Sequence, residues 1–374
     1  MLESKVEQRT ITNYPPCALH IYRGKYIIVG TYELNKETGH RIGSINVYNE
    51  DLKLLKIYNT YGAVLDLKLS PFNDKLVATA HSTGNITIWE LKETEKDIIL
   101  TEVVNFVVFD SGVLISSLHF SPHDAKTVCV TSTSGEVALL NIATQDISLK
   151  FQIDRSSSYD GRAEVTPYEV QGENVSGIEA IVETFDEAHS LECWTAEFGQ
   201  LQPFSQVLFT GGDDSCLMAH DLRSKQMIWS NNRIHDSGVV AIKSSTTTFR
   251  NDRPTSLVTG SYDDHIRSFD LRMLGDSIYP GRNVPVAELK SCNLGGGVWR
   301  FSEMPKAGSE DTLMVCCMYD GAKIVSMNDT NEEYFKVTNY LKEGHESMCY
   351  GGDWCNEFIA TCSFYDKSLQ KWKP

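Results

Sequence analysis

The stretch LVTGSYDDHIRSFDLR at residues 257–272 decides the fold, because LFTGGDDSCLMAHDLR at residues 208–223 repeats its design. Each copy contains a short apolar run, a glycine, a turn with aspartate, an alternating run and the tripeptide Asp-Leu-Arg. Apolar and polar residues that alternate with a period of two are typical of half-buried strands. The two copies therefore predict two units of the same strand-turn-strand design.

Five weaker copies of this unit occur at residues 27–49, 76–91, 128–142, 313–327 and 358–373. A unit of short strands that recurs roughly every 40 to 50 residues is the signature of a β-propeller blade. Seven copies predict an all-β protein, a seven-bladed WD-repeat β-propeller with four strands in each blade. The position of the WD tryptophan is occupied by Tyr48, Trp89, Leu140, His220, Phe269, Val325 and Trp372.

We expect residues 1–374 to form a single propeller domain with one insertion. The insertion is residues 154–187, which contain nine acidic and two basic residues. Such a composition is typical of a solvated loop, and the alternative is a segment that docks a partner. The last copy has only three strand-like runs, so the segment SKVEQRTI at residues 4–11 is expected to supply its outer strand and close the ring.

The composition limits the classes of partner and compartment. The chain has 50 acidic against 34 basic residues and a net charge of −16, so its surface repels phosphate backbones and anionic lipids, and we expect no direct nucleic-acid partner. The N-terminus lacks the order of a secretory signal and no run of about eighteen apolar residues occurs, which predicts a cytoplasmic protein without a membrane span. The ten cysteines include no C-x-x-C pair and no zinc spacing, so we expect reduced thiols, no metal and no cofactor.

Acidic turns are expected around one mouth of the propeller channel. In a blade of this type, the turn between the second and third strands and the connection to the next blade open on the same face. Asp214 and Asp263 occupy two of these turns, and Asp213 and Asp264 are second carboxylates beside them. Neighbouring carboxylates repel one another unless a cation or a shared proton answers them. The four residues therefore indicate a cationic ligand, and the alternative is a pair of solvated turns.

Two histidines in the blade connections have a structural interpretation. WD-type blades use a histidine, a turn aspartate, a Ser or Thr and the tryptophan as a buried hydrogen-bond network. His235 fits such a network with Thr259, and His345 fits another with Asp366. A structural role is therefore expected to compete with any chemical role of these histidines.

Three glycines precede Trp299 and Arg300 in the stretch NLGGGVWRFS at residues 293–302. One interpretation is that they let the blade connection adopt positive φ and pass close to the axis. The other is that they expose backbone N–H groups that bind a carbonyl oxygen or a carboxylate, as in an oxyanion hole. Arg300 is expected to face either the mouth or a neighbouring carboxylate.

The chain contains no G-x-S-x-G elbow, phosphate-binding loop or H-E-x-x-H helix. A set of its motifs nevertheless resembles the WD-repeat diphthine methyl esterase family of the diphthamide pathway. The resemblance covers residues 205–372, and the first three blades match only as generic WD repeats. The motifs are TGGDDS (210–215), HDSGV (235–239), TGSYDD (259–264), GGGVWR (295–300), CCMYDGAKI (316–324), YGGDW (350–354) and ATCSFYD (360–366).

The resemblance implies a carboxylic ester hydrolase. Its expected substrate is the methyl ester of diphthine on a histidine of eukaryotic translation elongation factor two, and its product is the carboxylate that a later enzyme amidates to diphthamide. The substrate protein and other proteins of the pathway are the partners it implies. The alternative is a non-catalytic WD-repeat scaffold for protein assembly or trafficking.

The expected substrate is matched to residue types, because the family pattern transfers no catalytic residues. Diphthine carries a trimethylammonium group, which suits carboxylates or aromatic faces, and an ester carbonyl, which suits N–H donors. The candidate substrate-binding residues are Asp213, Asp214, Asp263, Asp264, Gly295, Gly296, Gly297, Trp299, Tyr350 and Asp353.

The catalytic candidates are His235, His345 and Arg300. A side chain that titrates near neutrality suits proton transfer, so either histidine is a candidate for the general base. Arg300 is a candidate donor to the ester carbonyl. The nucleophile stays open between water and the side chains of Ser237, Ser261 and Cys362.

Overall fold

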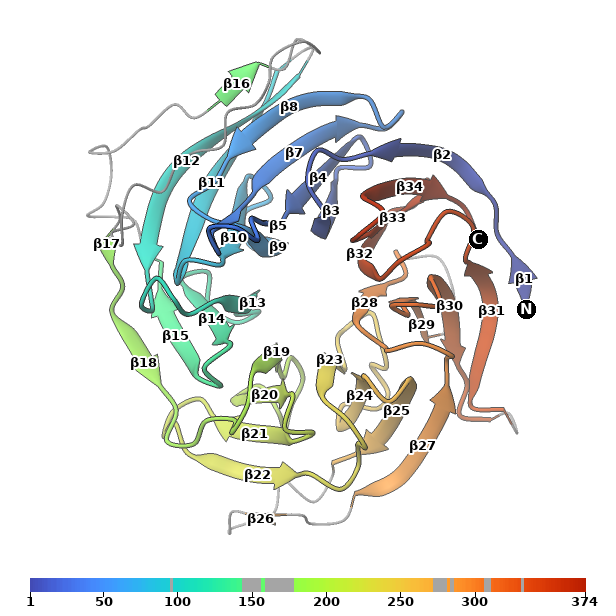
Figure 1. Cartoon of the computed structure of the whole chain (residues 1–374). Coiled ribbons are helices and arrows are strands. Elements are labelled where there is room, and N and C mark those ends of the chain that lie inside the picture. Colours follow the sequence, from blue (N-terminus) through green and yellow to red (C-terminus); the bar gives the residue numbers. More distant parts are fainter. Residues whose placement is uncertain are drawn as a thin grey trace.

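The computed structural model describes residues 1–94, 97–142, 156–158, 178–271, 281–282, 286–305, 311–330 and 333–374. These residues form seven β-sheets arranged as blades in a ring (Figure 1), and a small two-stranded sheet on the first blade. The predicted fold class, an all-β seven-bladed β-propeller, is confirmed. Among the described residues, no helix has the length and apolar character needed to cross a membrane.

Each of the first four blades runs outward from an inner strand at the channel. The small extra sheet pairs β5 (Glu33–Leu34) with β6 (Arg41–Ile42). The strands of blades one to four, from the channel outward, are β3 (Pro16–Tyr22), β4 (Tyr26–Thr31), β7 (Ser44–Asn49) and β8 (Leu54–Asn59); β9 (Val64–Leu69), β10 (Leu76–His81), β11 (Asn85–Glu93) and β12 (Ile98–Val107); β13 (Ile115–Phe120), β14 (Thr127–Ser132), β15 (Val137–Asn141) and β18 (Val182–Thr184); β19 (Cys193–Phe198), β20 (Val207–Gly212), β21 (Leu217–Asp221) and β22 (Met227–Asn231).

The last three blades follow the same plan, and the N-terminal strands complete two of them. The outer strand β31 pairs with β1 (Leu2–Glu3) in parallel. Short edge strands β16 (Ser156–Ser158), β17 (Ile178–Glu179) and β26 (Gly281–Arg282) extend blades one, two and four. The strands of blades five to seven are β23 (Val239–Ser244), β24 (Ser256–Ser261), β25 (His265–Asp270) and β27 (Ala287–Asn293); β28 (Arg300–Glu303), β29 (Asp311–Cys316), β30 (Ala322–Met327) and β31 (Phe335–Leu341); β32 (Cys349–Trp354), β33 (Ile359–Ser363), β34 (Ser368–Trp372) and β2 (Val6–Ile11).

The ring closes through the N-terminal segment, as the sequence predicts. Strand β2 pairs antiparallel with β34, with Val6 opposite Trp372 and Ile11 opposite Ser368. Strand β2 near the N-terminus and strand β34 near the C-terminus therefore share blade seven (Figure 1). Because β2 covers β34, the last blade presents no unpaired third strand to solvent.

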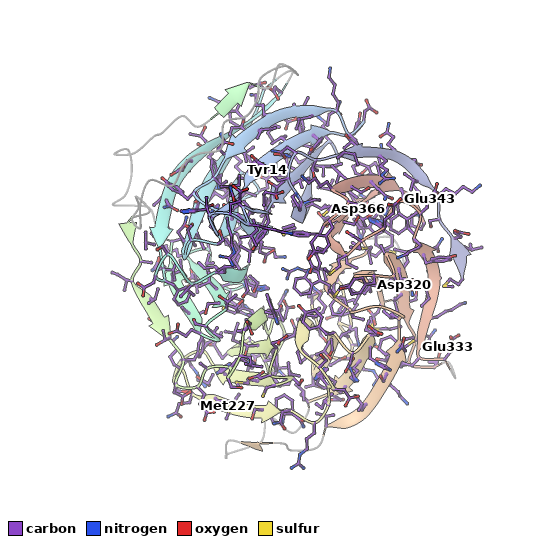
Figure 2. The ribbon with its side chains drawn as sticks, viewed as in Figure 1. Tyr14, Met227, Asp320, Glu333, Glu343 and Asp366 are labelled. Atoms are coloured by element: carbon purple, nitrogen blue, oxygen red, sulfur yellow. The ribbon has the colours of Figure 1, made fainter. Side chains whose placement is uncertain are left out.

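The core lies between neighbouring blades, where the faces of adjacent sheets pack together. Side chains fill these spaces around the ring (Figure 2). One cluster joins Ile28 and Tyr58 of blade one to Val77 and Trp89 of blade two. The side chains at all seven predicted WD positions lie on third strands and are at most 2 % exposed: Tyr48, Trp89, Leu140, His220, Phe269, Val325 and Trp372.

The structure differs from the expected acidic loop at 154–187 at both ends of the segment. Ser156–Ser158 pairs with β8 of blade one, and Ile178–Glu179 pairs with β12 of blade two. Residues 154–155 and 159–177 lie outside the described residues, so this part of the prediction concerns chain that the structure does not describe. Val182–Thr184, however, forms the fourth strand of blade three and pairs with β15, with Val182 opposite Leu140. Val182 packs on the apolar cluster that contains Leu140. The acidic composition of the segment predicted a loop, although the segment contains Val182, an apolar residue that helps to cover the third strand of this blade.

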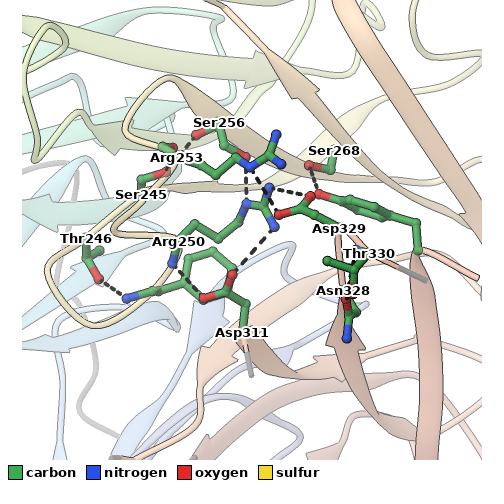
Figure 3. A network of polar contacts seen from close by, with 12 residues as sticks. Ser245, Thr246, Arg250, Arg253, Ser256, Ser268, Asp311, Asn328, Asp329 and Thr330 are labelled. Atoms are coloured by element: carbon green, nitrogen blue, oxygen red, sulfur yellow. Dashed lines mark hydrogen bonds and ion pairs between the residues drawn. The ribbon is translucent and has the colours of Figure 1, made fainter. Parts of the chain in front are cut away.

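A buried arginine joins blades five and six at the end of the blades opposite the β24–β25 turn (Figure 3). Arg250, 3 % exposed, lies in the loop between β23 and β24. Its Nε donates to Ser256 Oγ at 2.8 Å, and its other guanidinium nitrogens lie 3.5 Å from Asp311 and 3.3 Å from Asp329. Its backbone N–H also donates to the Asp311 carboxylate, at 2.7 Å. Burial of a charge is tolerated because carboxylates and a hydroxyl surround it.

Candidate functional site

A cavity of about 630 Å³ lies at the channel mouth formed by the blade connections and the turns between second and third strands. Seven of its lining side chains are aromatic, and they come from blades one, four, five, six and seven. The rest are aliphatic, small or charged. The lining residues are Pro15, Cys17, Tyr32, Glu33, Leu34, Lys36, Leu65, Leu114, Ser116, Thr133, Trp194, Tyr262, Trp299, Tyr350, Phe364, Tyr365 and Lys367.

Four aromatic side chains form a continuous wall on one side of this cavity, and we call Trp194, Tyr262, Trp299 and Tyr350 the aromatic wall. Trp299 is its centre. The ring of Trp299 stacks on Tyr262 at 5.7 Å between centroids, approaches Tyr350 at 4.9 Å and meets Trp194 edge-on at 5.8 Å. Each residue stands at or near the mouth end of a strand, so four blades contribute one residue each.

Asp213 lies behind the aromatic wall. Its Oδ1 accepts a hydrogen bond of 3.1 Å from the indole Nε1 of Trp194. A Cβ added to Gly238 would lie 2.9 Å from that same oxygen and 3.0 Å from the Tyr262 ring, so glycine lets the three groups close together. Burial, with smaller contributions from Tyr350 and Asp213, raises the pKa of Tyr262. Asp213 therefore orients the wall, and it is not among the residues that line the cavity.

Charged residues stand at the rim of the cavity on the side of blades one and seven. Strands β5 and β6 form a hairpin arm between the second and third strands of blade one, and this arm supplies Glu33 and Lys36. The Nζ of Lys367, from blade seven, lies 3.6 Å from Glu33 Oε2 and donates to Asn13 O at 3.2 Å. Glu33 is the one carboxylate among the described residues that line this cavity.

The glycine run packs tightly on the turn of blade six. Gly295 adopts a φ of +78°, and its N–H donates to Asn293 Oδ1 at 2.8 Å. A Cβ on Gly296 would lie 2.2 Å from the carbonyl oxygen of Cys317. A Cβ on Gly297 would lie 2.5 Å from the sulfur of Met318. Positive φ and close packing explain all three glycines without an oxyanion hole, and none of them lines the cavity.

Arg300 faces the carboxylate of Asp66 in the channel, which is one of the two placements that the sequence predicted. Its guanidinium carbon lies 5.4 Å from the centre of the Trp299 ring, and its Nη2 lies 3.8 Å from Asp66 Oδ1. Burial alone would raise the pKa of Asp66, but the charges of Lys68 and Arg300 lower it overall. Arg300 is thus paired with a carboxylate below the aromatic wall and does not line the cavity above it.

Both candidate histidines belong to buried networks. The Nε2 of His235 lies 2.8 Å from Thr259 Oγ1, and the Nε2 of His345 lies 2.8 Å from Thr361 Oγ1. The indole of Trp372 donates to the same Thr361 hydroxyl at 3.1 Å. Burial lowers the pKa of His235 to about 3 and that of His345 to about 4. The structure therefore brings neither histidine to the cavity.

Similarity to known proteins identifies the family of this chain. A search against models of known families finds no match. A diphthine methyltransferase of Saccharomyces cerevisiae is 55 % identical over 99 % of this chain and 98 % of its own length. The chain belongs to this family.

More distant comparisons agree with the family and with the fold. A diphthine methyltransferase of Schizosaccharomyces pombe is 29 % identical over 93 % of this chain and 90 % of its own length. A chain in the crystal structure of a mitotic checkpoint complex superposes with a TM-score of 0.66 over all of this chain and 93 % of its own, at 12 % identity, which shows the fold alone. The diphthamide-pathway family expected from the motifs is thereby confirmed, under a name that states methyl transfer.

In this member of the diphthine methyltransferase family, the paired turn aspartates have separate partners. Asp214 lies 2.9 Å from the Nδ1 of His189, which was not predicted as a site residue although it precedes an inner strand as His235 does. Asp263 pairs with Arg267 through both carboxylate oxygens, at 2.9 and 2.8 Å. Asp264 adopts a φ of +67°, and its carbonyl accepts from the Leu294 N–H. The carboxylates of Asp214 and Asp263 and the backbone of Asp264 thus make contacts within the propeller, and the carboxylate of Asp213 contacts the aromatic wall.

Asp353 connects blades and lies away from the cavity lining. It follows Tyr350 on β32, so it stands deeper along the channel. Its carboxylate accepts from the Ile21 N–H at 2.8 Å and from the Ser302 hydroxyl at 3.0 Å, and it lies 3.0 Å from His20 Nδ1. These partners belong to blades one and six, so Asp353 holds three inner strands together.

Two of the three side-chain nucleophiles proposed from the sequence, Ser261 and Cys362, are buried, and the third, half-buried Ser237, is not among the residues that line the cavity. Ser261 is fully buried, and its hydroxyl donates to the carbonyl of Ser237 at 3.0 Å. Cys362 is fully buried within blade seven. The cavity is lined instead by the thiol of Cys17 and the hydroxyl of Ser116.

A second cavity of about 440 Å³ lies on the other side of Arg300. Its lining includes Lys68, Glu197 and Lys243, which already have partners. Lys68 lies 3.4 Å from Asp66, Lys243 lies 3.1 Å from Glu303, and Glu197 accepts from the backbone and side chain of Ser244. The aromatic cavity is therefore the better candidate for a ligand that carries both a charge and apolar groups.

Proposed function

We propose that this protein acts in diphthamide biosynthesis as a carboxylic ester hydrolase. It removes the methyl ester from diphthine methyl ester on eukaryotic translation elongation factor two and leaves diphthine for later amidation. Membership of a family named for diphthine supports the substrate class. Because that substrate is a cytoplasmic translation factor, the cytoplasm is the proposed compartment.

The observation that carries the proposal is the aromatic cavity itself. Its volume of about 630 Å³ is in the range of sites that enclose a whole small molecule. It opens at the mouth of the ring, where a modified side chain on the surface of another protein can enter. Aromatic and aliphatic walls with a few charged groups at the rim suit a ligand that is largely methylated.

The proposed reaction is attack of water on the ester carbonyl. A bond forms between the water oxygen and the carbonyl carbon, the bond from that carbon to the methoxy oxygen breaks, and methanol leaves with one proton. Burial raises the pKa of the Cys17 thiol, which disfavours a thiolate nucleophile. The Ser116 hydroxyl already donates to the Cys193 carbonyl. Both facts favour water among the nucleophiles considered.

Glu33 is assigned as the general base that takes the proton from this water. It is the one carboxylate among the described lining residues, and its position at the rim leaves it 35 % exposed. The ammonium of Lys367, 3.6 Å from Glu33, is assigned to stabilise the negative charge that develops on the carbonyl oxygen. His235 and His345 retain the structural role that their buried partners support.

The test uses purified protein and elongation factor two that carries methylated diphthine, in water labelled with heavy oxygen. Hydrolysis predicts that the modified peptide loses the mass of one CH₂, gains one heavy oxygen in its carboxylate, and releases methanol. If the peptide loses the methyl group but gains no heavy oxygen, the reaction is methyl transfer and the proposed hydrolysis is wrong. An unchanged peptide that still binds would support the non-catalytic scaffold.

The variant Glu33→Gln tests the base. It is expected to lower kcat by about a hundredfold, the usual range for a lost general base. Glu37→Gln is the matched control, because Glu37 lies on the same hairpin arm and is exposed outside the cavity lining. Equal activity of Glu33→Gln and the natural protein would remove Glu33 from the chemical step.

A further inference from the structure

The four rings of the aromatic wall line one side of the cavity and contact one another. The ring of Trp299 is central, because its centroid lies between 4.9 and 5.8 Å from those of Trp194, Tyr262 and Tyr350. The centroid of the Phe364 ring lies 5.4 Å from that of Tyr350. An aromatic face carries partial negative charge, so a group of such faces attracts a cation that is too methylated to donate hydrogen bonds.

The charges near the wall are compatible with a cationic ligand. The guanidinium of Arg300 lies near Trp299, but the carboxylate of Asp66 lies 3.8 Å from that guanidinium and offsets its positive charge. At the rim, Lys367 is paired with Glu33. Asp213 lies against Trp194 and Tyr262 on the side away from the cavity, and its hydrogen bond to the indole holds Trp194 in place. The wall is therefore backed by a carboxylate, and its nearest arginine is neutralised by another.

The turn aspartates are less suited than the wall to hold such a cation. The sequence indicated these carboxylates, but Asp214 is paired with His189 and Asp263 with Arg267. A trimethylammonium group offers no N–H to a carboxylate, so it gains most from broad contact with ring faces. The cavity provides that contact and does not provide a pair of carboxylates.

We propose that the aromatic wall is a binding site for a quaternary ammonium group, and that it makes the cavity select a trimethylammonium over a neutral group of the same shape. The identity of the natural ligand, the trimethylammonium of methylated diphthine, rests on the proposed function. The preference for the cation depends only on the wall. This assignment adds Trp194 and Tyr262 to the binding residues and explains why Trp299 and Tyr350 meet.

Choline is the probe, and its carbon analogue with a tert-butyl group in place of the trimethylammonium is the matched neutral ligand. Binding of each to the full-length protein is measured by calorimetry at constant ionic strength. The natural protein is expected to bind choline about tenfold more tightly than the analogue, which is within the range of partly desolvated cation–π contacts. Equal affinities for the two ligands would overturn the proposal.

Variants of the wall separate ring faces from general apolar contact. Trp299→Leu is expected to weaken choline binding by roughly threefold to thirtyfold and to leave the analogue within about twofold, whereas Trp299→Phe retains most of the difference. Tyr319→Leu is the matched control, because Tyr319 is an exposed aromatic residue of the blade-six turn and does not line the cavity. Equal loss of both ligands in Trp299→Leu would make the wall merely apolar. If Trp299→Leu fails to fold, Tyr350→Leu is measured against Tyr350→Phe with the same expected results.

Binding and turnover give independent outcomes. Discrimination between choline and its analogue, together with no product in the ester assay, would retain the cation site and reject the hydrolase. Product formation without discrimination would retain the hydrolase and reject the cation site.

Discussion

The carboxylate of Asp213 accepts a hydrogen bond from the indole Nε1 of Trp194 at 3.1 Å, and this bond turns a carboxylate expected to bind ligand into a support for an aromatic ring. The indole side chain has one hydrogen-bond donor and no acceptor. A partly buried tryptophan therefore needs an acceptor such as this carboxylate. Asp213 thereby fixes Trp194 against Trp299, 5.8 Å away. The function of the aspartate lies in the orientation of the wall.

Substitutions at Asp213 distinguish orientation from charge. Asp213→Asn keeps an acceptor oxygen, so KM for the methylated substrate is expected to change by less than about twofold. Asp213→Leu leaves the indole unpaired, and the loss of one hydrogen bond is expected to raise KM about fivefold. Asp264→Asn is the control in a neighbouring turn. An increase with Asp213→Asn as large as that with Asp213→Leu would show that the charge of Asp213 contacts the ligand.

Buried histidines predict a loss of stability in mild acid. The pKa values of His235 and His345 are lowered mainly by burial, to about 3 and 4, from an ordinary value of 6.5. Between these values and 6.5 the unfolded chain binds protons that the folded chain refuses, so stability is full above pH 6.5 and falls as pH decreases. Each histidine is expected to contribute a slope of about 1.4 kcal/mol per pH unit in the lower part of this window.

The pH slope is measured by thermal or urea unfolding between pH 7 and pH 5. His235→Gln and His345→Gln are expected to flatten it, whatever their stability at neutral pH, while His40→Gln, a change at an exposed histidine, leaves it unaltered. Both variants are expected to keep catalysis. Normal folding of His235→Gln with a hundredfold fall in kcat would return His235 to the chemical step.

Loss of Arg250 is expected to weaken the junction of blades five and six. Arg250→Met leaves Asp311 and Asp329 without a buried partner and is expected to lower the free energy of unfolding by about 3 kcal/mol. Arg253→Met is the matched change, because Arg253 contacts Asp329 at 3.1 Å but is 37 % exposed, and its cost is expected to be below about 1 kcal/mol. Urea unfolding checks both values, and equal costs would contradict the role of burial.

The glycine run predicts a steric effect on the site. Gly296→Ala places a Cβ against the Cys317 carbonyl, so the connection must shift, at an expected cost of about 1 to 3 kcal/mol, and Trp299 moves with it. Choline affinity is expected to fall together with stability. Gly112→Ala is the control, since a Cβ there meets nothing within 4 Å. Full choline affinity in Gly296→Ala would show that the run does not position the wall.

For residues such as His235 and Asp263, the sequence predicted both a structural and a chemical role and did not show which of the two roles applies. His235 bonds to Thr259, as its network position predicts, whereas the carboxylate of Asp263 pairs with Arg267. Spacing places residues in the same blade, but it does not decide which of several acceptors a donor reaches. A distance of 2.8 Å settles that choice for His235 because one hydrogen bond occupies its Nε2.

Val182–Thr184 shows a different limit of the sequence. Its acidic surroundings predict a loop, yet it pairs with β15 because blade three requires a fourth strand. A single valine that packs beside Leu140 carries too weak a pattern to be recognised before its neighbour is known.

The sequence by itself determined the number of blades, the buried third-strand positions and the closure of the ring by residues 4–11, because each depends on a pattern that repeats along the chain. Only the tertiary structure decided the site. Trp194, Trp299 and Tyr350 stand at equivalent positions at the start of the inner strands of blades four, six and seven, and Tyr262 follows the second strand of blade five. The repeat gives each of them a place in its own blade, but it does not show that their rings touch. Closure of the ring brings the ends of these strands around one axis, and the four aromatic side chains come into contact only as a result.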